Sequence, residues 1–287
     1  MINMFKTGLL LAGLTALLLW LGNLLGGQAG LLIALVLAAV LNLGSYWFSD
    51  KLVIAMSGAQ PLSEREAPEL YQMLREMTHR ANMPMPRLYL IPDPQPNAFA
   101  TGRNPQNGVV AVTQGLLQLM NYEEVKGVIA HELAHIKNRD TLIMAVAATI
   151  AGAISFLAEM LYYKTLFFGS SDDEESAPNP IGAFAMLFLA PLAAMIIQLA
   201  ISRAREYEAD RVGAEIAGTP LGLASALRKL EAAAHQIPNL HARPSTAHLY
   251  IVNPLRGGWL LALFSTHPPV QERIRRLEAM ARGWRVA

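Results

Sequence analysis

The stretch His131-Glu132-Leu133-Ala134-His135 organises the interpretation of the whole chain. On an α-helix, residues four apart lie on one face, one turn apart, so both imidazoles can reach a single metal ion. Glu132 is offset by about 100° from His131, which leaves its carboxylate beside the metal and free of it. Such a carboxylate can take a proton from water. The pattern therefore predicts a zinc site with His131 and His135 as metal ligands and Glu132 as a catalytic residue.

The segment that carries this motif is expected to be helical. Asn121 is a plausible N-cap, and Glu124 occupies the capping-box position three residues later. No proline interrupts residues 121–141. The apolar residues that follow at helical spacing are Val125, Val128, Ile129 and Leu133. The alternative is an ordinary helix with two surface histidines, and the rest of the chain must supply a third ligand to exclude it.

Composition points to a membrane protein. Hydrophobic residues make up 53% of the 287 residues, charged residues 16%, and the mean hydropathy is +0.30. These values are too apolar for a soluble domain of this size. The net charge of +1 gives no reason to expect nucleic-acid binding. Because the chain has no cysteine, any zinc ligands must be His, Asp or Glu.

Hydrophobic runs divide the chain into membrane and soluble parts. An apolar run of about 40 residues is long enough for two spans, at about 20 residues each. Gly26–Gly30 is the turn-like interruption, so we expect a hairpin of about 7–26 and 30–48, with a cleaved signal peptide as the alternative for its first segment. The expected parts are an N-terminal transmembrane hairpin (1–50), a soluble part with the HExxH helix (51–141), a third transmembrane helix (142–163), an acidic loop (164–180), a fourth transmembrane helix (181–202), and a second soluble part with the third ligand (203–287).

The flanking charges orient these spans. Basic residues gather on one side of the membrane: Lys6, Lys51, Lys137, Arg139, Arg203 and Arg205. The positive-inside rule then places both termini and the HExxH motif in the cytoplasm. The fold class expected is a mainly α membrane protein with four transmembrane helices and a cytoplasmic α+β domain.

The soluble part contains short strands and one amphipathic helix. Residues 87–91, 97–101 and 109–113 read as strands, with a turn at Asn104–Gly108 that suits a hairpin between the last two. We expect a small antiparallel sheet. Ser63 and Glu66 form a capping-box pattern before the amphipathic helix.

A third metal ligand must come from elsewhere in the chain. Glu206 and Asp210 are four residues apart and share a helix face, just after the fourth span returns to the side of the membrane that carries HExxH. One carboxylate can bind zinc while the other orients a ligand imidazole. The alternative for Glu206 is an ordinary charged helix start beside Arg203 and Arg205.

Several segments together resemble the HtpX family of membrane zinc endopeptidases, relatives of the CAAX prenyl endopeptidases. They are HELAH (131–135), SRAREYEAD (202–210), NAFATG (97–102), VAVTQGLL (110–117) and STHP (265–268). The resemblance implies a gluzincin-like protease domain with one zinc ion per chain. It implies Glu206 as third zinc ligand and Asp210 as support for a ligand histidine, His131.

The same resemblance implies two further sites. Asn97, Ala98 and Phe99 are similar to an edge strand that binds substrate by main-chain hydrogen bonds; the alternative is a core hairpin. His267 is similar to a histidine facing the cleft, which can donate to the oxyanion; the alternative is a helix-start histidine with no chemistry.

Taken with the resemblance, the residues predict a zinc metalloendopeptidase of the bacterial inner membrane, with its active site facing the cytoplasm. Its expected substrates are misfolded or damaged membrane proteins, its surroundings are the lipid bilayer, and its role is stress response and protein quality control. One alternative is a CAAX-type prenyl-protein endopeptidase, disfavoured because only four spans are expected. The other is a non-catalytic scaffold stabilised by zinc, disfavoured because structural zinc sites usually have four protein ligands, often cysteines.

Overall fold

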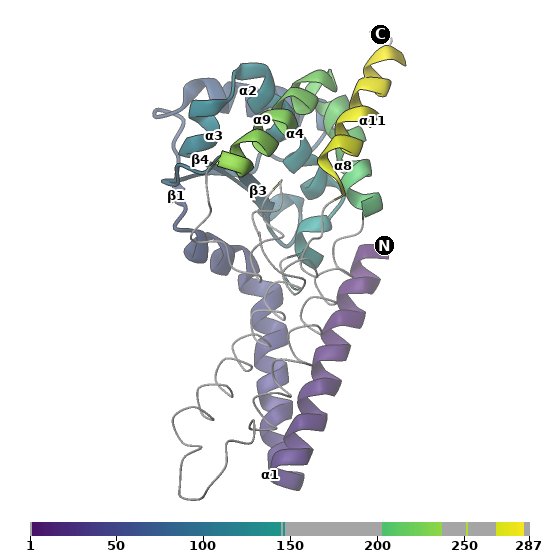
Figure 1. The fold of residues 1–287 in the computed structure, drawn as a ribbon. Helices are drawn as coiled ribbons and strands as arrows, with labels where there is room; N and C mark the ends of the chain where they lie inside the picture. The colour runs from purple at the N-terminus through teal and green to yellow at the C-terminus, as the bar shows by residue number, and fades with distance from the viewer. Residues whose placement is uncertain (1, 145, 147–202, 237–250, 252–267, 284–287) are drawn as a thin grey trace, which may run out of the picture.

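The computed structural model describes residues 2–144, 146, 203–236, 251 and 268–283 (Figure 1). A long apolar arm, α1 (Ile2–Ser57), carries a domain in which helices surround a small sheet. The expected third and fourth spans lie outside the described residues, apart from residues 142–144 and 146. The acidic loop 164–180 lies outside them as well.

Helix α1 doubles back on itself. The side-chain amide of Asn42 donates to the hydroxyl of Thr15 at 2.8 Å, although 27 residues of straight helix would span about 40 Å. Gly27 has a φ of 56°, a left-handed conformation that glycine adopts without steric cost. Among the described residues, one helix, Gly27–Phe48, is long and apolar enough to cross a membrane by length and composition, and Leu11–Trp20 is a shorter apolar helix. The expectation of four spans therefore stays a prediction.

The sheet has four strands in the order β1-β2-β4-β3. They are β1 (Gln60–Pro61), β2 (Arg87–Ile91), β3 (Ala98–Thr101) and β4 (Val109–Thr113). The hairpin β3–β4 is antiparallel, as expected, but β2 pairs with β4 in parallel, so the prediction of an antiparallel sheet was wrong. The turn signal specifies the β3–β4 hairpin alone. It does not specify that the other edge of β4 pairs with β2 in the same direction.

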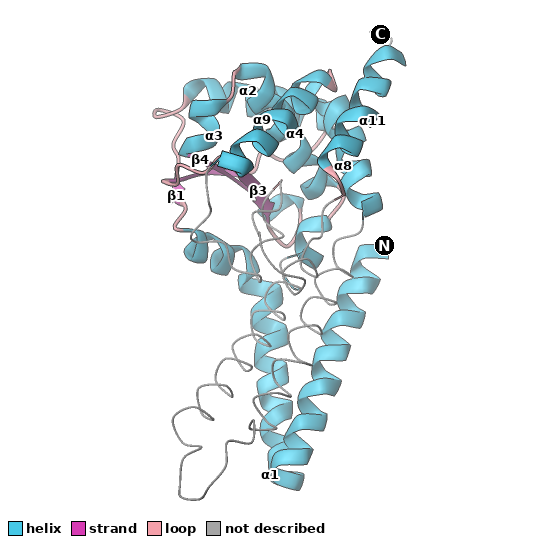
Figure 2. Ribbon diagram, viewed as in Figure 1, coloured by secondary structure: helices cyan, strands magenta, loops and turns pink. Residues whose placement is uncertain are grey.

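The two faces of the sheet pack against different parts of the chain. One face contributes Leu88, Ala98 and Val110 to the main core shared with the helices. The other face packs Phe99 and Ala111 against Val53, near the end of α1. In Figure 2 the strands accordingly lie between the helical layer and the upper end of α1. All five residues of β4 are buried, as expected for a strand covered on both faces.

The helical layer consists of six described helices. They are α2 (Pro68–Ala81), α3 (Gln114–Leu119), α4 (Tyr122–Lys137), α8 (Arg203–Ala217), α9 (Leu221–Gln236) and α11 (Val270–Gly283), with a short 3₁₀ turn η1 (Pro105–Asn107). Helix α4 lies centrally and packs mainly against α8 and α9. The core therefore surrounds the helix that carries the HExxH motif.

The amphipathic helix starts later than its capping-box pattern suggests. Ser63 and Glu66 do bond to each other, with the Ser63 backbone N–H donating to Glu66 at 2.8 Å. The helix nevertheless begins at Pro68. A proline disfavours helical backbone in the residue before it, and Ala67 has φ −140° and ψ 62°. Ser63 and Glu66 therefore close an isolated turn ahead of α2 and do not cap the helix.

Candidate metal centre

Helix α4, which carries the HExxH motif, has a complete capping box at its N-terminus. The Asn121 side chain accepts from the Glu124 N–H at 3.0 Å, and the Glu124 carboxylate accepts from the Asn121 N–H at 2.9 Å, which completes the predicted capping box. His131, Glu132 and His135 are all buried. The two imidazole rings meet edge to face with centroids 4.7 Å apart. Spacing on one helix thus directs both histidines to the same point.

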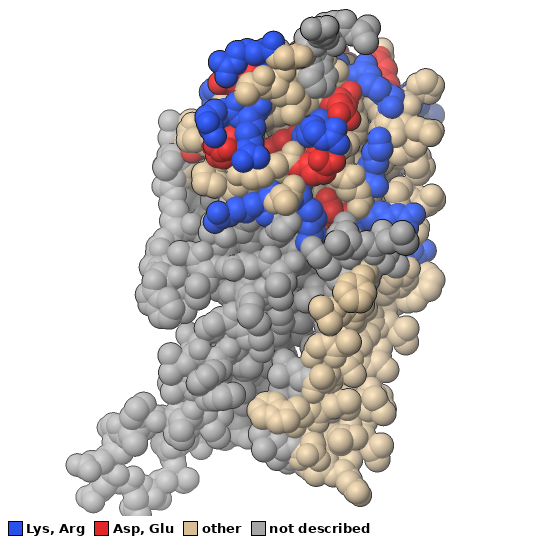
Figure 3. All heavy atoms as spheres, turned by 90° about the vertical axis from the view of Figure 1, so that its right-hand side faces the viewer, with Lys and Arg blue, Asp and Glu red and all other residues tan. Residues whose placement is uncertain are grey.

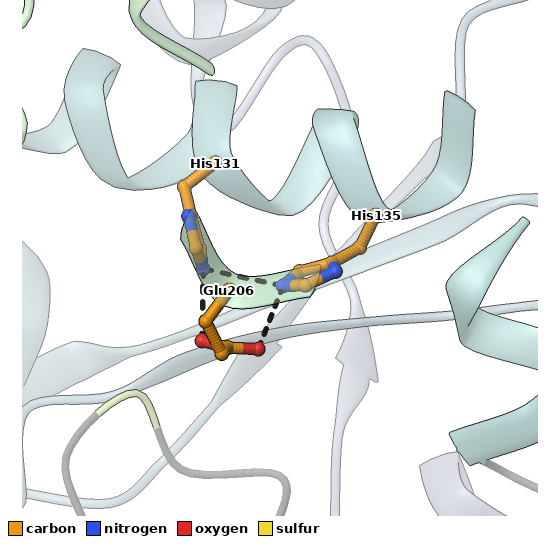
Figure 4. A group of neighbouring side chains, drawn as sticks. All are labelled: His131, His135 and Glu206. Atoms are coloured by element: carbon orange, nitrogen blue, oxygen red, sulfur yellow. Dashed lines mark hydrogen bonds and ion pairs between the residues drawn. The ribbon is translucent and has the colours of Figure 1, made fainter. Parts of the chain in front are cut away.

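A glycine lets α8 approach α4 at this point. A Cβ atom built on Gly213 would lie 2.9 Å from the Cα of His131, closer than real side chains come. Helix α8 therefore packs backbone against backbone beside the first histidine. The same helix carries Glu206, which is 1% exposed and lies against both imidazoles (Figure 4). Two segments about 70 residues apart in sequence are thereby joined at one site.

The three side chains fit a tetrahedral metal ion. His131 Nε2 lies 3.2 Å from His135 Nε2 and 3.7 Å from Glu206 Oε2, and His135 Nε2 lies 3.4 Å from Glu206 Oε1. Ligands at about 2.0–2.1 Å from a tetrahedral zinc ion would be separated by about 3.3 Å. The candidate ligand atoms, one from each of the three residues, all lie within 4.8 Å of one another. Two imidazoles and a carboxylate are also a donor set that zinc accepts at catalytic sites.

A buried carboxylate lies beside the Nδ1 atom of each imidazole, His131 and His135. Asp210 Oδ1 lies 3.0 Å from His131 Nδ1, and Asp140 Oδ2 lies 3.1 Å from His135 Nδ1. Each contact leaves Nε2 directed at the other ligands. A carboxylate behind a ligand histidine sets its tautomer and orientation. The family resemblance predicts Asp210 beside His131, and no sequence pattern predicts Asp140 beside His135.

Asp140 depends on how α4 ends. The Asn138 N–H donates to Ala134 O at 2.9 Å, and the next residue, Arg139, has a left-handed φ of 59°. This turn brings Asp140 back toward His135. Because Asp140 is five residues after the histidine, regular helical spacing gives no signal for the pair.

Arg273 of α11 is the second residue that sequence reasoning missed. Its guanidinium is fully buried and donates to both Asp210 oxygens, from Nε at 2.9 Å and from Nη2 at 2.7 Å. Its Nη1 lies 3.6 Å from Glu206 Oε2. A signal did exist in the sequence: Arg273 lies on the apolar face of its helix, between Val270, Ile274 and Leu277. A charged residue on such a face needs a buried partner.

Burial and neighbouring charges shift the pKa values of these groups. Burial raises the pKa of Glu132 to about 7, with Glu206 adding to the rise. Burial lowers the pKa of His131, and the charge of Arg273 lowers it further. Burial opposes ionisation of Asp210, but Arg273 and then His131 outweigh it and hold its pKa at about 2. Asp210 is therefore the carboxylate that stays charged behind the ligand histidine.

Glu132 lies beside the cluster of His131, His135 and Glu206 and next to the edge of the sheet. The backbone N–H of Ala100 in β3 hydrogen-bonds to its carboxylate. Since Thr113 N–H donates to Asn97 O at 2.9 Å, the alternation of an antiparallel pair turns the backbone groups of Ala98 and Ala100 toward the outer edge. Strand β3 is an edge strand in the described sheet. Its outer edge thus faces the site.

The predicted substrate-binding residues take different positions. Ala98 and Phe99 belong to β3 and are buried, and the Phe99 side chain packs on the α1 side. The side-chain oxygen of Asn97 accepts from the Ile251 N–H at 3.2 Å. Ile251 O in turn lies 3.4 Å from Nη1 of Arg273. His267, predicted as a catalytic residue, lies outside the described residues.

Comparisons with known proteins identify the family of this chain. Residues 64–281 match peptidase family M48. A protease HtpX homologue of Syntrophobacter fumaroxidans is 58% identical over 278 residues, covering 96% of this chain and 99% of the relative. A protease HtpX homologue of Persephonella marina is 55% identical over 280 residues, which cover 96% of this chain and 97% of the relative. One of Syntrophotalea carbinolica is 53% identical over 280 residues, which cover 97% of this chain and 99% of the relative.

One solved structure is also similar. The crystal structure of S. mikatae Ste24p matches with a TM-score of 0.49 and 20% identity, over 96% of this chain. This chain spans 65% of that one, slightly less than two thirds of its length. The family match over most of the chain, together with the HtpX homologues over nearly its full length, shows that this protein belongs to peptidase family M48 as an HtpX-type metallopeptidase.

Proposed function

We propose that the protein is an integral-membrane zinc endopeptidase that cleaves misfolded or damaged membrane proteins at the cytoplasmic side of a bacterial inner membrane. The observation that carries the hydrolytic part is the convergence of His131, His135 and Glu206 on one point, with the Glu132 carboxylate beside it. When bound there, zinc would polarise a peptide carbonyl and make water more acidic. Family membership indicates a metallopeptidase, which disfavours a purely structural metal.

Glu132 is the proposed general base and acid. Its carboxylate accepts a proton from the attacking water and delivers it to the leaving amine. The Ala100 N–H that bonds to this carboxylate orients it. His267 is the proposed donor to the oxyanion that develops on the scissile carbonyl.

The outer edge of β3 is the proposed substrate-binding surface. An extended peptide would pair with both backbone groups of Ala98 and with the C=O of Ala100, since the Ala100 N–H bonds to Glu132. These main-chain hydrogen bonds would place little demand on the sequence of the peptide. The scissile bond would then lie beside Glu132, because Ala100 contacts that residue directly. We assign to Asn97 the role of holding Ile251, and through it Arg273, in place.

The membrane location is proposed from α1 and the composition. The apolar segment Gly27–Phe48 is long enough to span a bilayer. The same helix continues to Val53, which packs directly on Phe99 of the substrate-binding strand. A segment of a membrane protein that leaves the bilayer near this point would need little extra length to reach the site.

The central test is Glu132→Gln in the detergent-purified protein, measured by metal content and cleavage of casein or a membrane protein. We expect zinc to stay at one ion per chain while cleavage falls by about 100- to 10,000-fold, the usual contribution of a general base. Glu123→Gln, exposed in the first turn of the same helix, is the matched control. Full activity of Glu132→Gln would remove this residue from catalysis.

A second test distinguishes the proposed zinc ligand Glu206 from a nearby carboxylate on the same helix. Glu206→Gln should lose zinc, whereas Glu208→Gln, exposed two residues later, should keep it.

Comparing a prenylated CAAX peptide with an unmodified peptide distinguishes the two endopeptidase functions. Preferential cleavage of the prenylated peptide would overturn the proposed substrate class.

A further inference from the structure

Aromatic side chains mark one level at the end of the candidate span. Tyr46 and Trp47 pack edge to face with ring centroids 5.5 Å apart, and Trp47 and Phe48 are each about half exposed, at 50% and 56%. Exposed aromatic residues at the end of an apolar span favour the boundary between hydrocarbon and headgroups. We take this level as the membrane surface, which rests on the proposed membrane location.

Two cations lie on these rings. The Arg103 guanidinium lies 4.4 Å from the centre of the Trp47 ring, and the Lys51 ammonium lies 5.4 Å from that of Phe48. Arg103 is not a flank of any span. It belongs to the loop between β3 and β4, and the fold brings it to the aromatic level. A basic residue from the protease domain therefore reaches the same depth as the end of the arm.

Residues that follow helix α4 contact the same loop. Thr141 Oγ1 donates to Gly102 O at 2.7 Å, so residues after α4 lie beside Arg103. Arg205, at the start of α8, interacts electrostatically with Asp140. Because Arg205 Nε and Nη1 are buried, Arg205 is not available to a ligand at this surface. We call the other cations the basic collar; its members, exposed or partly buried, are Lys51, Arg103, Lys137, Arg139 and Arg203.

Two acidic residues near the collar, within the part of the chain that the structure describes, have partners outside it. Asp50 is engaged by Arg87 at 2.9 Å, outside the collar, and Asp140 is buried against His135. In Figure 3 basic side chains line the border where the charged domain meets the apolar arm. A set of cations at the level of the headgroups matches phosphate groups in charge and in position.

We propose that the basic collar binds the headgroups of anionic phospholipids, with Arg103 as its central contact. Local contacts define the conformation of the loop that carries Arg103: Asn104 caps η1, and Gly102 has a φ of 129° with no room for a Cβ beside Asn107 O. Gly102 directly follows β3, whose edge faces Glu132. Lipid binding at Arg103 therefore steadies the substrate-binding strand.

The first experiment measures lipid retention without using catalysis. The full-length protein, solubilised from mixed bilayers, is analysed by native mass spectrometry for bound phosphatidylglycerol and phosphatidylcholine. Phosphatidylglycerol should be retained preferentially, and Arg103→Gln should weaken that preference about fivefold, as expected for one cation near an anionic surface. Arg211→Gln is the control, because Arg211 is exposed on α8 and pairs with Glu208 and Glu215. Equal retention of both lipids, or equal losses in the two variants, would overturn the proposal.

The second experiment tests the effect on the strand. Hydrogen exchange of residues 98–108 is measured in nanodiscs with and without phosphatidylglycerol. Slower exchange with the anionic lipid, lost in Arg103→Gln, supports the proposal, and unchanged exchange contradicts it. Both readouts are independent of hydrolysis. Preferential lipid retention by a protein without peptidase activity would refute the proposed function alone, and activity without lipid preference would refute this inference alone.

Discussion

Replacing Arg273 by methionine is expected to weaken zinc binding, because Arg273 holds Asp210, which in turn contacts His131. The guanidinium is fully buried, donates twice to Asp210, and lies 3.6 Å from Glu206. Methionine is also a long unbranched side chain, but it carries no charge and no N–H donor. The substitution therefore mainly removes the charge and the hydrogen bonds.

The magnitude follows from what is left behind. Removing one partner of a buried ion pair costs about 3–5 kcal/mol, because the other charge remains uncompensated. The residue left uncompensated is Asp210, which holds the Nδ1 side of His131 at 3.0 Å. Losing the support behind a ligand histidine usually weakens metal binding by about 10- to 100-fold. We expect losses of this size both in unfolding free energy and in zinc affinity.

The assays are chelator competition for zinc and thermal unfolding in detergent. Arg273→Lys restores the charge without the two-pronged contact and should fall between wild type and Arg273→Met. Arg276→Met is the control on the same helix, where the guanidinium is exposed and stacks on Tyr207 at 3.8 Å. The reasoning fails if Arg273→Met binds zinc and unfolds like wild type, or if Arg276→Met loses as much.

Three further changes test other parts of the site. Gly213→Ala should push α8 away from the backbone of His131, lowering unfolding free energy by about 1–3 kcal/mol and weakening zinc binding; intact zinc affinity would contradict this. Asp140→Asn should weaken zinc binding about 10- to 100-fold by removing the charged acceptor behind His135, and chelator competition at neutral pH checks it. Glu124→Gln should lower unfolding free energy by about 1–3 kcal/mol at neutral pH; burial opposes ionisation of Glu124, but Lys229 and Ser225 outweigh it and lower its pKa. Because the folded-state pKa is below the ordinary value of about 4.3, this stabilisation is present above that value and disappears as pH falls through the folded-state pKa, so wild type and variant should converge there in pH-dependent unfolding.

Local sequence patterns were sufficient for α4 and for the hairpin β3–β4. The capping box of Asn121 and Glu124 is a contact between residues three apart, so it can be read without a fold. The turn residues 104–108 likewise specify that β3 and β4 pair, and both strands form close to the expected positions. In these cases the contacts that stabilise the element lie within the element itself.

Longer-range features were predicted incompletely. The pattern placed Glu206 and Asp210 on one helix face, but it left open which of them contacts the histidines. The family resemblance chose between them, and the structure shows both in contact, Glu206 with the Nε2 atoms and Asp210 with Nδ1 of His131. The pattern at Ser63 and Glu66 did not specify where α2 begins, because the restriction that Pro68 imposes on Ala67 outweighs the capping signal before it.

The sequence alone predicted two side chains that can bind a metal ion, His131 and His135, because that prediction depends on residue type and on spacing along a single helix. Tertiary structure decided what surrounds them: the parallel pairing of β2 with β4, the carboxylate of Asp140, the buried charge of Arg273, and the reach of Arg103 to Trp47. These contacts join distant segments or depend on an irregular turn. Their energy comes from burial and charge compensation, which exist only once the segments have packed together.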